Sequence, residues 1–219
     1  MEITLIILLF IISYLLGSIP GGYLIMKITR KEDIRNYGSK STGATNTTRI
    51  LGFKLGLLAG LIDVTKGMIV PIVLTLFKLN GLIYINNFNL IAYYGLAAVI
   101  GHIYPIFLGF RGGKAVATSL GVALFLNPYI AILGVLVFIL VAKLSNYVSL
   151  SSMIAALFIG VFAHLQFIFG FNILGIEPLD LESVIAIYIC VLIIIYRHIP
   201  NIKRMIKGEE NKVSDLKNR

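Results

Sequence analysis

Residues 3–26 read ITLIILLFIISYLLGSIPGGYLIM, a stretch without a single charged side chain. A helix that crosses a bilayer needs roughly 20 consecutive apolar residues, so this stretch predicts a membrane span. A cleavable signal peptide would begin with a cationic region, whereas Glu2 is the only charged residue before Lys27. We therefore expect the stretch to be retained as the first transmembrane helix.

The rest of the chain has the same apolar character. Hydrophobic residues make up 58% of its 219 positions and charged residues 13%, and the mean hydropathy is +0.93. A soluble domain of this length could not cover so much apolar surface. Only helices and closed barrels satisfy their backbone in lipid, and the alternation of barrel strands is missing from the sequence. The sequence therefore predicts an all-α, polytopic membrane helix bundle. Its further apolar runs are 52–77, 88–109, 115–126, 128–142, 150–171 and 183–196.

The basic residues determine the expected topology. Seven crossings that start outside place the basic segments on the cytoplasmic side, as the positive-inside rule requires. Those segments are 27–54, 111–114, Lys143 and the tail from Arg197. The N-terminus then lies outside and the C-terminus in the cytoplasm. Because runs 115–126 and 128–142 are short for full spans, a five-span alternative in which they merge or re-enter stays open.

The same charges bear on domain organisation and partners. We expect residues 1–200 to form a single integral membrane domain and residues 201–219 a basic cytoplasmic tail. The formal net charge of +9 would suggest nucleic acid in a soluble protein. Here the positive-inside rule explains the cations, so we predict no nucleic-acid partner.

Two glycine-containing loops on the expected cytoplasmic side have the composition of anion sites. Residues 37–49, YGSKSTGATNTTR, combine glycines and hydroxyls with the planar donor fork of Arg49. A polar loop that merely caps the following span is the alternative for this stretch. Residues 110–118, FRGGKAVAT, place two glycines and Lys114 before an apolar helix. The P-loop pattern is absent, so this second loop is the weaker phosphate signal.

Two further polar clusters fall on the same side. In YVSLSSM, residues 147–153, Ser149 and Ser152 share one helical face, although serines in membrane helices usually bond backbone. In YRHIPNIKR, residues 196–204, His198 and Asn201 share a face within a cationic helix end that could simply anchor the span. The convergence of all four clusters on one side indicates a common site.

Charged and histidine residues inside the spans have a structural explanation. Asp63 and Lys66 stand three residues apart, and we expect them to pair because charges in lipid are costly. His102 and His164 have no second ligand at metal spacing, so we predict no metal site.

The clusters supply cations and donors but few bases, which suits a site that holds anions. From the residues alone, an enzyme acting on phosphorylated substrates and an anion or organophosphate transporter both remain open. The absence of internal repeats argues against the transporter. A scaffold protein would leave the loops unexplained.

Several motifs together resemble one family, the membrane-integral bacterial glycerol-3-phosphate acyltransferases of the PlsY type. The motifs run through residues 17–210: GSIPGGYLI, DIRNYGSKSTGATNTTRILG, LIDVTKG, GHIYPIFLGFRGGKAVATSLG, YVSLSSM and YRHIPNIKRMIKGEE. The resemblance implies seven helices, a multi-pass location in the bacterial cell membrane and an active site open to the cytoplasm. It implies transfer of a fatty acyl group from acyl phosphate to the 1-hydroxyl of sn-glycerol 3-phosphate, the first acylation of phospholipid synthesis. The products would be lysophosphatidate and phosphate. No cofactor is implied, and the partners would be the two substrates, the lipid bilayer and a soluble enzyme that supplies acyl phosphate.

The family's site residues carry over by position. The resemblance implies catalytic roles for Ser39, Arg49, Lys114, His198 and Asn201, and substrate binding by Thr45, Asn46, Gly112, Gly113 and Ser152. Glu209 or Glu210 matches a structural glutamate. Acyl phosphate is a reactive mixed anhydride, so we expect no acyl-enzyme intermediate. A substrate phosphate oxygen would accept the hydroxyl proton, with His198 as the alternative base.

The chain departs from the family pattern at three places. Lys40 stands within Gly38-Ser39-Lys40-Ser41 where the family reads Gly-Ser-Gly-Asn, Ala115 replaces a glycine, and Ile199-Pro200 replaces Arg-Glu. Ala115 would be strained at positive φ. Lys40 would alter the fine shape of its loop rather than its preference for anions.

Overall fold

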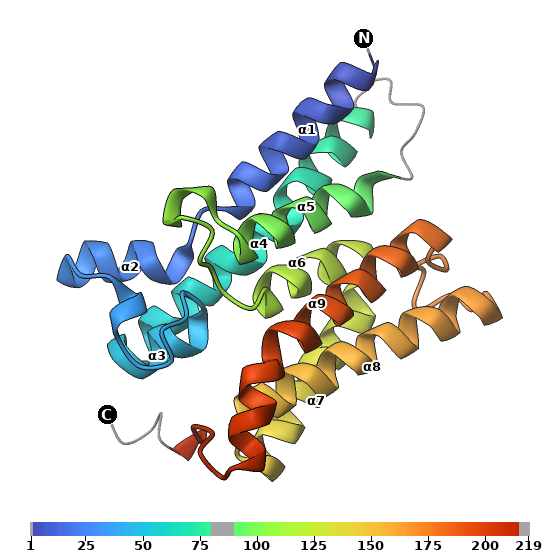
Figure 1. Ribbon diagram of the computed structural model, residues 1–219. Coiled ribbons are helices and arrows are strands. Elements are labelled where there is room, and N and C mark those ends of the chain that lie inside the picture. The colour runs from blue at the N-terminus through green and yellow to red at the C-terminus, as the bar shows by residue number, and fades with distance from the viewer. Residues whose placement is uncertain (1, 80–89, 215–219) are drawn as a thin grey trace.

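The computed structural model describes residues 2–79 and 90–214, and these residues form a bundle of helices (Figure 1). Its elements are α1 Glu2–Gly17, α2 Gly21–Arg30, the 3-10 turn η1 Ile34–Asn36, α3 Ala44–Leu51, α4 Phe53–Leu79, α5 Ile91–Ile103, the 3-10 turn η3 Ile106–Leu108, α6 Val116–Leu126, α7 Pro128–Ser145, α8 Val148–Phe169 and α9 Leu181–Ile206. The expected all-α architecture is confirmed. The 80–87 loop and the start of the 88–109 run lie outside the described residues, as do the last five residues of the tail.

Five segments of the described chain are long and apolar enough to cross a membrane. They are Phe53–Leu79, Ile91–Leu108, Pro128–Ser145, Val148–Phe169 and Leu181–Ile206. The pair α1 and α2 adds a sixth if it counts as one bent span. Helix α6 is shorter, and its 11 residues extend only about 16 Å along the axis. The short run 115–126 is therefore a helix of its own that does not reach the length of a full span.

The first apolar run, 3–26, is not one straight helix. It breaks between Gly17 and Gly21, and the two halves meet at an angle of 43°. Pro20 stands just before α2, where its ring and missing N–H interrupt helical hydrogen bonding. As a result α2 turns away from the axis of α1 and lies beside α3 at one end of the bundle (Figure 1).

Close contact between α4 and α6 depends on two glycines. A Cβ on Gly67 of α4 would overlap the carbonyl of Thr118, and one on Gly121 of α6 would overlap the carbonyl of Val64. Small residues are the usual means by which membrane helices approach each other. This contact places the N-terminus of α6, and the loop before it, against the middle of α4.

A buried ion pair joins α4 to its neighbours. Lys66 Nζ lies 2.8 Å from Asp63 Oδ1, which confirms the expected pairing. Lys66 also donates to the carbonyl of Ile19 at 2.8 Å, at the break between α1 and α2. His102 of α5 contributes a third group, with Nδ1 3.5 Å from Asp63 Oδ1. The pair therefore connects the broken first helix with α4 and α5.

Helix α9 extends well beyond the apolar run 183–196. It continues through the basic residues to Ile206 and so crosses the domain boundary that we expected at residue 200. The chain then turns back along the end of the bundle where α2 and α3 lie, opposite the end that holds the N-terminus (Figure 1).

Two of the departures from the family pattern adopt left-handed backbone. Lys40 has φ 57° and Ala115 has φ 63°. Left-handed φ costs an L-residue roughly 1–2 kcal/mol, and glycine avoids this cost. Both loops therefore adopt at these positions a backbone conformation that glycine would take without strain.

We expect Ala115→Gly to stabilise the protein by about 1 kcal/mol or less, because relief of left-handed strain exceeds the entropy that glycine loses on folding. Ala117→Gly in the first turn of α6 is the matched control and should destabilise by about 1 kcal/mol. Thermal unfolding in detergent compares the two. Equal losses of stability in both variants would contradict strain at Ala115.

Candidate active site

A cavity of about 510 Å³ opens between α3, α4, α6, α7, α8 and α9. Most of its polar lining comes from helix ends and loops at the end of the bundle where α2, α3 and the C-terminal tail gather. Those residues include Ser39, Ser41, Thr45, Asn46, Arg49, Lys114, Ser149, Ser152, His198, Asn201, Arg204 and Glu210. Its apolar lining comes from the middles of the helices, including Leu120, Phe138, Ile159, Ile187 and Val191. One cavity therefore joins a cationic region to a hydrophobic slot.

The polar loop 37–46 is organised by one buried side chain. Asn46 Oδ1 accepts from the backbone N–H of Ser39 at 2.9 Å, and Nδ2 donates to the carbonyls of Tyr37 and Ser41 at 3.1 and 2.9 Å. The amide of Asn46 is thus engaged with the loop backbone. This shape directs Ser39 and Thr45 to the cavity wall, and Arg49 follows Thr45 one helical turn later.

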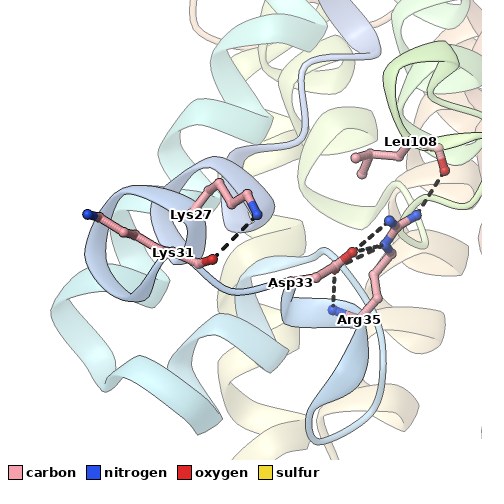
Figure 2. A network of polar contacts seen from close by, with 5 residues as sticks. All are labelled: Lys27, Lys31, Asp33, Arg35 and Leu108. Carbon is pink, nitrogen blue, oxygen red and sulfur yellow. Dashed lines mark hydrogen bonds and ion pairs between the residues drawn. The ribbon is translucent and has the colours of Figure 1, made fainter.

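An arginine joins η1, directly before the polar loop, to η3, in the segment that leads to Lys114 (Figure 2). Arg35 donates to both carboxylate oxygens of Asp33, at 2.7–3.0 Å, and Nη1 donates to the carbonyl of Leu108 at 2.8 Å. These hydrogen bonds from Arg35 lower the pKa of Asp33. Nearby, Lys27 donates to the carbonyl of Lys31 and closes the end of α2. The contacts of Arg35 with Asp33 and with Leu108 therefore connect the segments that precede the two predicted anion-binding loops.

Gly112 and Gly113 position the backbone instead of lining the cavity. Their N–H groups donate to the carbonyls of Ile103 and His102 at 3.1 Å each, and their carbonyls accept from Arg197 Nη2 at 3.4 and 3.1 Å. A Cβ on Gly113 would overlap the ring of His102. The geometry required of a phosphate cradle, with free N–H groups facing a ligand, is not found at these two residues.

Lys114 begins a chain of short polar contacts. Its Nζ donates to Asn201 Oδ1 at 2.6 Å, Asn201 Nδ2 donates to Glu210 Oε1 at 2.6 Å, and Arg204 Nε donates to Glu210 Oε2 at 2.8 Å. Burial lowers the pKa of Lys114 to about 8; the cations of Arg204, Arg197 and Arg49 act in the same direction and Glu210 opposes them. Burial raises the pKa of Glu210, but its hydrogen bonds outweigh that effect and the net shift is downward.

His198 is buried in the wall of the cavity with a defined ring orientation. Its Nδ1 lies 2.8 Å from the carbonyl of Ile194, which can only accept, so Nδ1 carries the proton. In the neutral ring Nε2 is then the acceptor. Ser152 donates to the carbonyl of Val148 at 2.9 Å, and its oxygen keeps lone pairs for a ligand.

Eight of the ten site residues expected from the sequence line this cavity, and Gly112 and Gly113 do not. Asp63 and Glu210, which were expected only as structural, also line the cavity, as does His102, which was considered only as a metal ligand. For Asp63 the only sequence signal was its charge inside a span. The hydrogen bonds of Asn46 to its own loop, and those of Arg35 to Asp33 and Leu108, could not be predicted from the sequence beyond the residue types.

A helix bundle whose cavity has cations at its polar end and apolar side chains within has the chemistry to accommodate an anionic head and an apolar chain. The family model described as glycerol-3-phosphate acyltransferase matches residues 7–208. A glycerol-3-phosphate acyltransferase of Listeria monocytogenes is 43% identical, with 94% of this chain and 96% of the relative covered. One of Acholeplasma laidlawii is 38% identical, with 99% and 97% covered.

Solved structures agree with the sequence comparison. The glycerol 3-phosphate form of PlsY (YgiH), an integral membrane glycerol 3-phosphate acyltransferase, superposes with a TM-score of 0.79 at 36% identity and covers 94% of both chains. Its lysophosphatidic acid form gives 0.78 at 34% identity, over 97% of this chain and 98% of that one. The chain belongs to the glycerol-3-phosphate acyltransferase family of the PlsY type, and it is an integral membrane acyltransferase.

We expect Gly113→Ala to lower acyl transfer by about 100-fold, because the added methyl displaces the loop from His102 and moves Lys114 off its position. The control is Gly60→Ala in the same cavity, where the new Cβ would lie 3.4 Å from that of Ala44. The measurement is the steady-state rate of acyl transfer by each of the two variants. A Gly113→Ala enzyme as active as Gly60→Ala would show that the loop does not need this contact.

We expect affinity for phosphorylated substrate to fall as pH rises through about 8, where Lys114 loses its proton. Below that pH the ammonium is present and would attract the anion. The measurement is KM for the phosphorylated acceptor against pH. Lys114→Arg should move the alkaline fall to higher pH, since guanidinium stays charged. An unchanged profile in Lys114→Arg would assign the fall to another group.

Proposed function

We propose that the protein transfers a fatty acyl group from acyl phosphate to the sn-1 hydroxyl of sn-glycerol 3-phosphate and releases lysophosphatidate and phosphate. The observation that carries the proposal is the continuity of a cationic region with an apolar slot in one cavity of about 510 Å³. The cationic region suits two phosphates and the slot suits an acyl chain. Relatives named glycerol-3-phosphate acyltransferases, and structures of one in glycerol 3-phosphate and lysophosphatidic acid forms, support it.

The site would act by alignment and charge neutralisation. Arg49 and Lys114 would hold the two phosphates together despite their repulsion, and Ser39, Thr45 and Ser152 would orient their oxygens. The acceptor hydroxyl attacks the acyl carbonyl, an ester C–O bond forms, and the bond from acyl carbon to phosphate oxygen breaks. The hydroxyl proton passes to a phosphate oxygen, or to Nε2 of His198 as the alternative. Phosphate is a good leaving group, so no covalent acyl-enzyme is required.

Asn201, Asn46 and the two glycines serve this chemistry in different ways. Asn201 would orient the ammonium of Lys114 through the bond of 2.6 Å. Asn46 and the pair Gly112 and Gly113 would shape the loops that present Ser39 and Lys114. No cofactor or metal is part of this scheme. The proposal includes a soluble enzyme as the source of acyl phosphate.

The proposed topology has seven crossings in the bacterial cell membrane, with the N-terminus outside, and it counts the short helix α6 as one crossing beside the five long spans and the bent pair α1 and α2. The two described ends of the chain lie at opposite ends of the bundle, as an odd number of crossings requires (Figure 1). The polar end of the cavity would then face the cytoplasm, where glycerol phosphates are found. Residues 1–200 form the membrane domain in this scheme. The tail from residue 201 lies on the cytoplasmic side and contributes Asn201 and Glu210 to the site.

Phosphate release from palmitoyl phosphate by the purified protein in a lipidic medium tests the reaction. Release should require sn-glycerol 3-phosphate, and Arg49→Ala should lower it by roughly 100-fold or more. Lys54→Ala, which removes an exposed cation nearby, should retain the wild-type rate. Silence with acyl phosphate, together with uptake of glycerol 3-phosphate into liposomes, would favour the transporter instead.

A further inference from the structure

The segment after α9 folds back over the polar end of the cavity. We call residues 207–214 the C-terminal strap. Near its end, the N–H of Val213 donates to the carbonyl of Asn146 at 2.7 Å and the N–H of Ser214 donates to Asn146 Oδ1 at 3.0 Å. Asn146 Nδ2 donates in return to Ser214 Oγ at 3.2 Å. The strap is thereby fastened to the connection between α7 and α8.

The other end of the strap is fastened to α9. The N–H of Gly208 donates to the carbonyl of Met205, and the N–H of Glu209 donates to that of Arg204 at 2.8 Å. Glu210 lies between the two attachments and, with Asn211, lines the cavity. Its carboxylate accepts from Asn201 and Arg204. The strap therefore places one negative charge inside a cationic site.

Glu210 opposes a set of cations around Lys114. Three cations lower the pKa of the Lys114 ammonium: Arg49 of α3, and Arg197 and Arg204 of α9. His198 also repels the ammonium when it is protonated. Glu210 is the group that favours the charged form of Lys114. Through Asn201 it also fixes the direction of Lys114 Nζ.

We propose that Asn146 is a positioning residue, which anchors the C-terminal strap so that Glu210 stays in the site and holds Asn201 and Lys114 for substrate. The inference rests on the proposed function in one respect, that Lys114 binds a substrate phosphate. It adds the residue between α7 and the YVSLSSM motif, which none of the quoted motifs includes, to the residues that support the site. Asn146 has φ 61°, a left-handed conformation that asparagine tolerates better than most residues.

The anchor matters because the strap is short and irregular. Released from Asn146, its end would gain conformational freedom, which favours the detached strap. Glu210 would then leave its buried position for water part of the time. The cations that remain around Lys114 would then lower the fraction of Lys114 that is protonated, and Asn201 Nδ2 would lose Glu210 as its acceptor.

Asn146→Gly tests the proposal without straining the backbone, because glycine accepts positive φ. It removes both side-chain bonds to Ser214 and keeps the backbone carbonyl that Val213 uses. Asn146→Asp keeps an acceptor for the N–H of Ser214 and serves as the conservative rescue. Lys143→Ala, an exposed position on the last turn of α7, is the matched control, and Glu210→Gln is the positive control.

The first measurement is the reactivity of Lys114 with acetic anhydride across pH, read by mass spectrometry of its peptide. Only the neutral amine reacts, so this titrates Lys114 without turnover. We expect about threefold more reactive Lys114 at neutral pH in Asn146→Gly and in Glu210→Gln, and no change in Lys143→Ala. Asn146→Asp should lie near wild type.

The second measurement is acyl-transfer kinetics of the same variants. KM for sn-glycerol 3-phosphate should rise by about tenfold in Asn146→Gly and recover in Asn146→Asp. If Lys114 labelling and KM change in Glu210→Gln but not in Asn146→Gly, the anchoring role of Asn146 is overturned. If they change in neither variant, the coupling of the strap to Lys114 is overturned. Shifted labelling in a protein without acyl transfer would refute the proposed function alone.

Discussion

The polar end of the cavity must keep several cations close together at the edge of a hydrocarbon layer. An ammonium or guanidinium taken from water loses hydration worth several kcal/mol, and neighbouring like charges add to that cost. The chain Lys114–Asn201–Glu210–Arg204 offsets it with charge-assisted hydrogen bonds of 2.6–2.8 Å. Its members come from the loop before α6, from α9 and from the C-terminal strap. The packing of these three elements therefore depends on one polar chain, which remains cationic overall and suited to anions.

The fold was predictable where long apolar runs are bounded by charged loops. Long apolar runs predicted α4, α7 and α8 because lipid leaves a helix as the only way to satisfy the backbone. The break at Pro20 and the extent of α9 were not predictable in the same way. The last turns of α9 carry several cations, of which Arg204 lines the cavity, and hydropathy cannot distinguish such a helix end from a loop. Burial of His198 and Asn201 becomes visible only when the partner elements are placed.

The site was predictable by residue type but not by partner. Lys114 and Arg49 are cations that follow glycine-containing loop sequence, and both line the cavity as expected. Gly112 and Gly113 show the same local pattern, yet their N–H groups are turned to the end of α5. A sequence tells that a backbone can approach closely at glycine. It does not tell whether the approaching group is a phosphate or the ring of His102.

That ambiguity has a physical origin in membrane proteins. Lipid offers no donors or acceptors, so irregular backbone near the bilayer must be satisfied by the protein. Asn46 bonds its own loop, Arg35 bonds Asp33 and the carbonyl of Leu108, and Arg197 bonds the carbonyls of the glycine loop. Each of these side chains has the chemistry of an anion ligand and uses it on the chain itself. A polar side chain at such a site can serve substrate only after the backbone beside it is satisfied, so the supporting residues must be as polar as the residues that touch the phosphates.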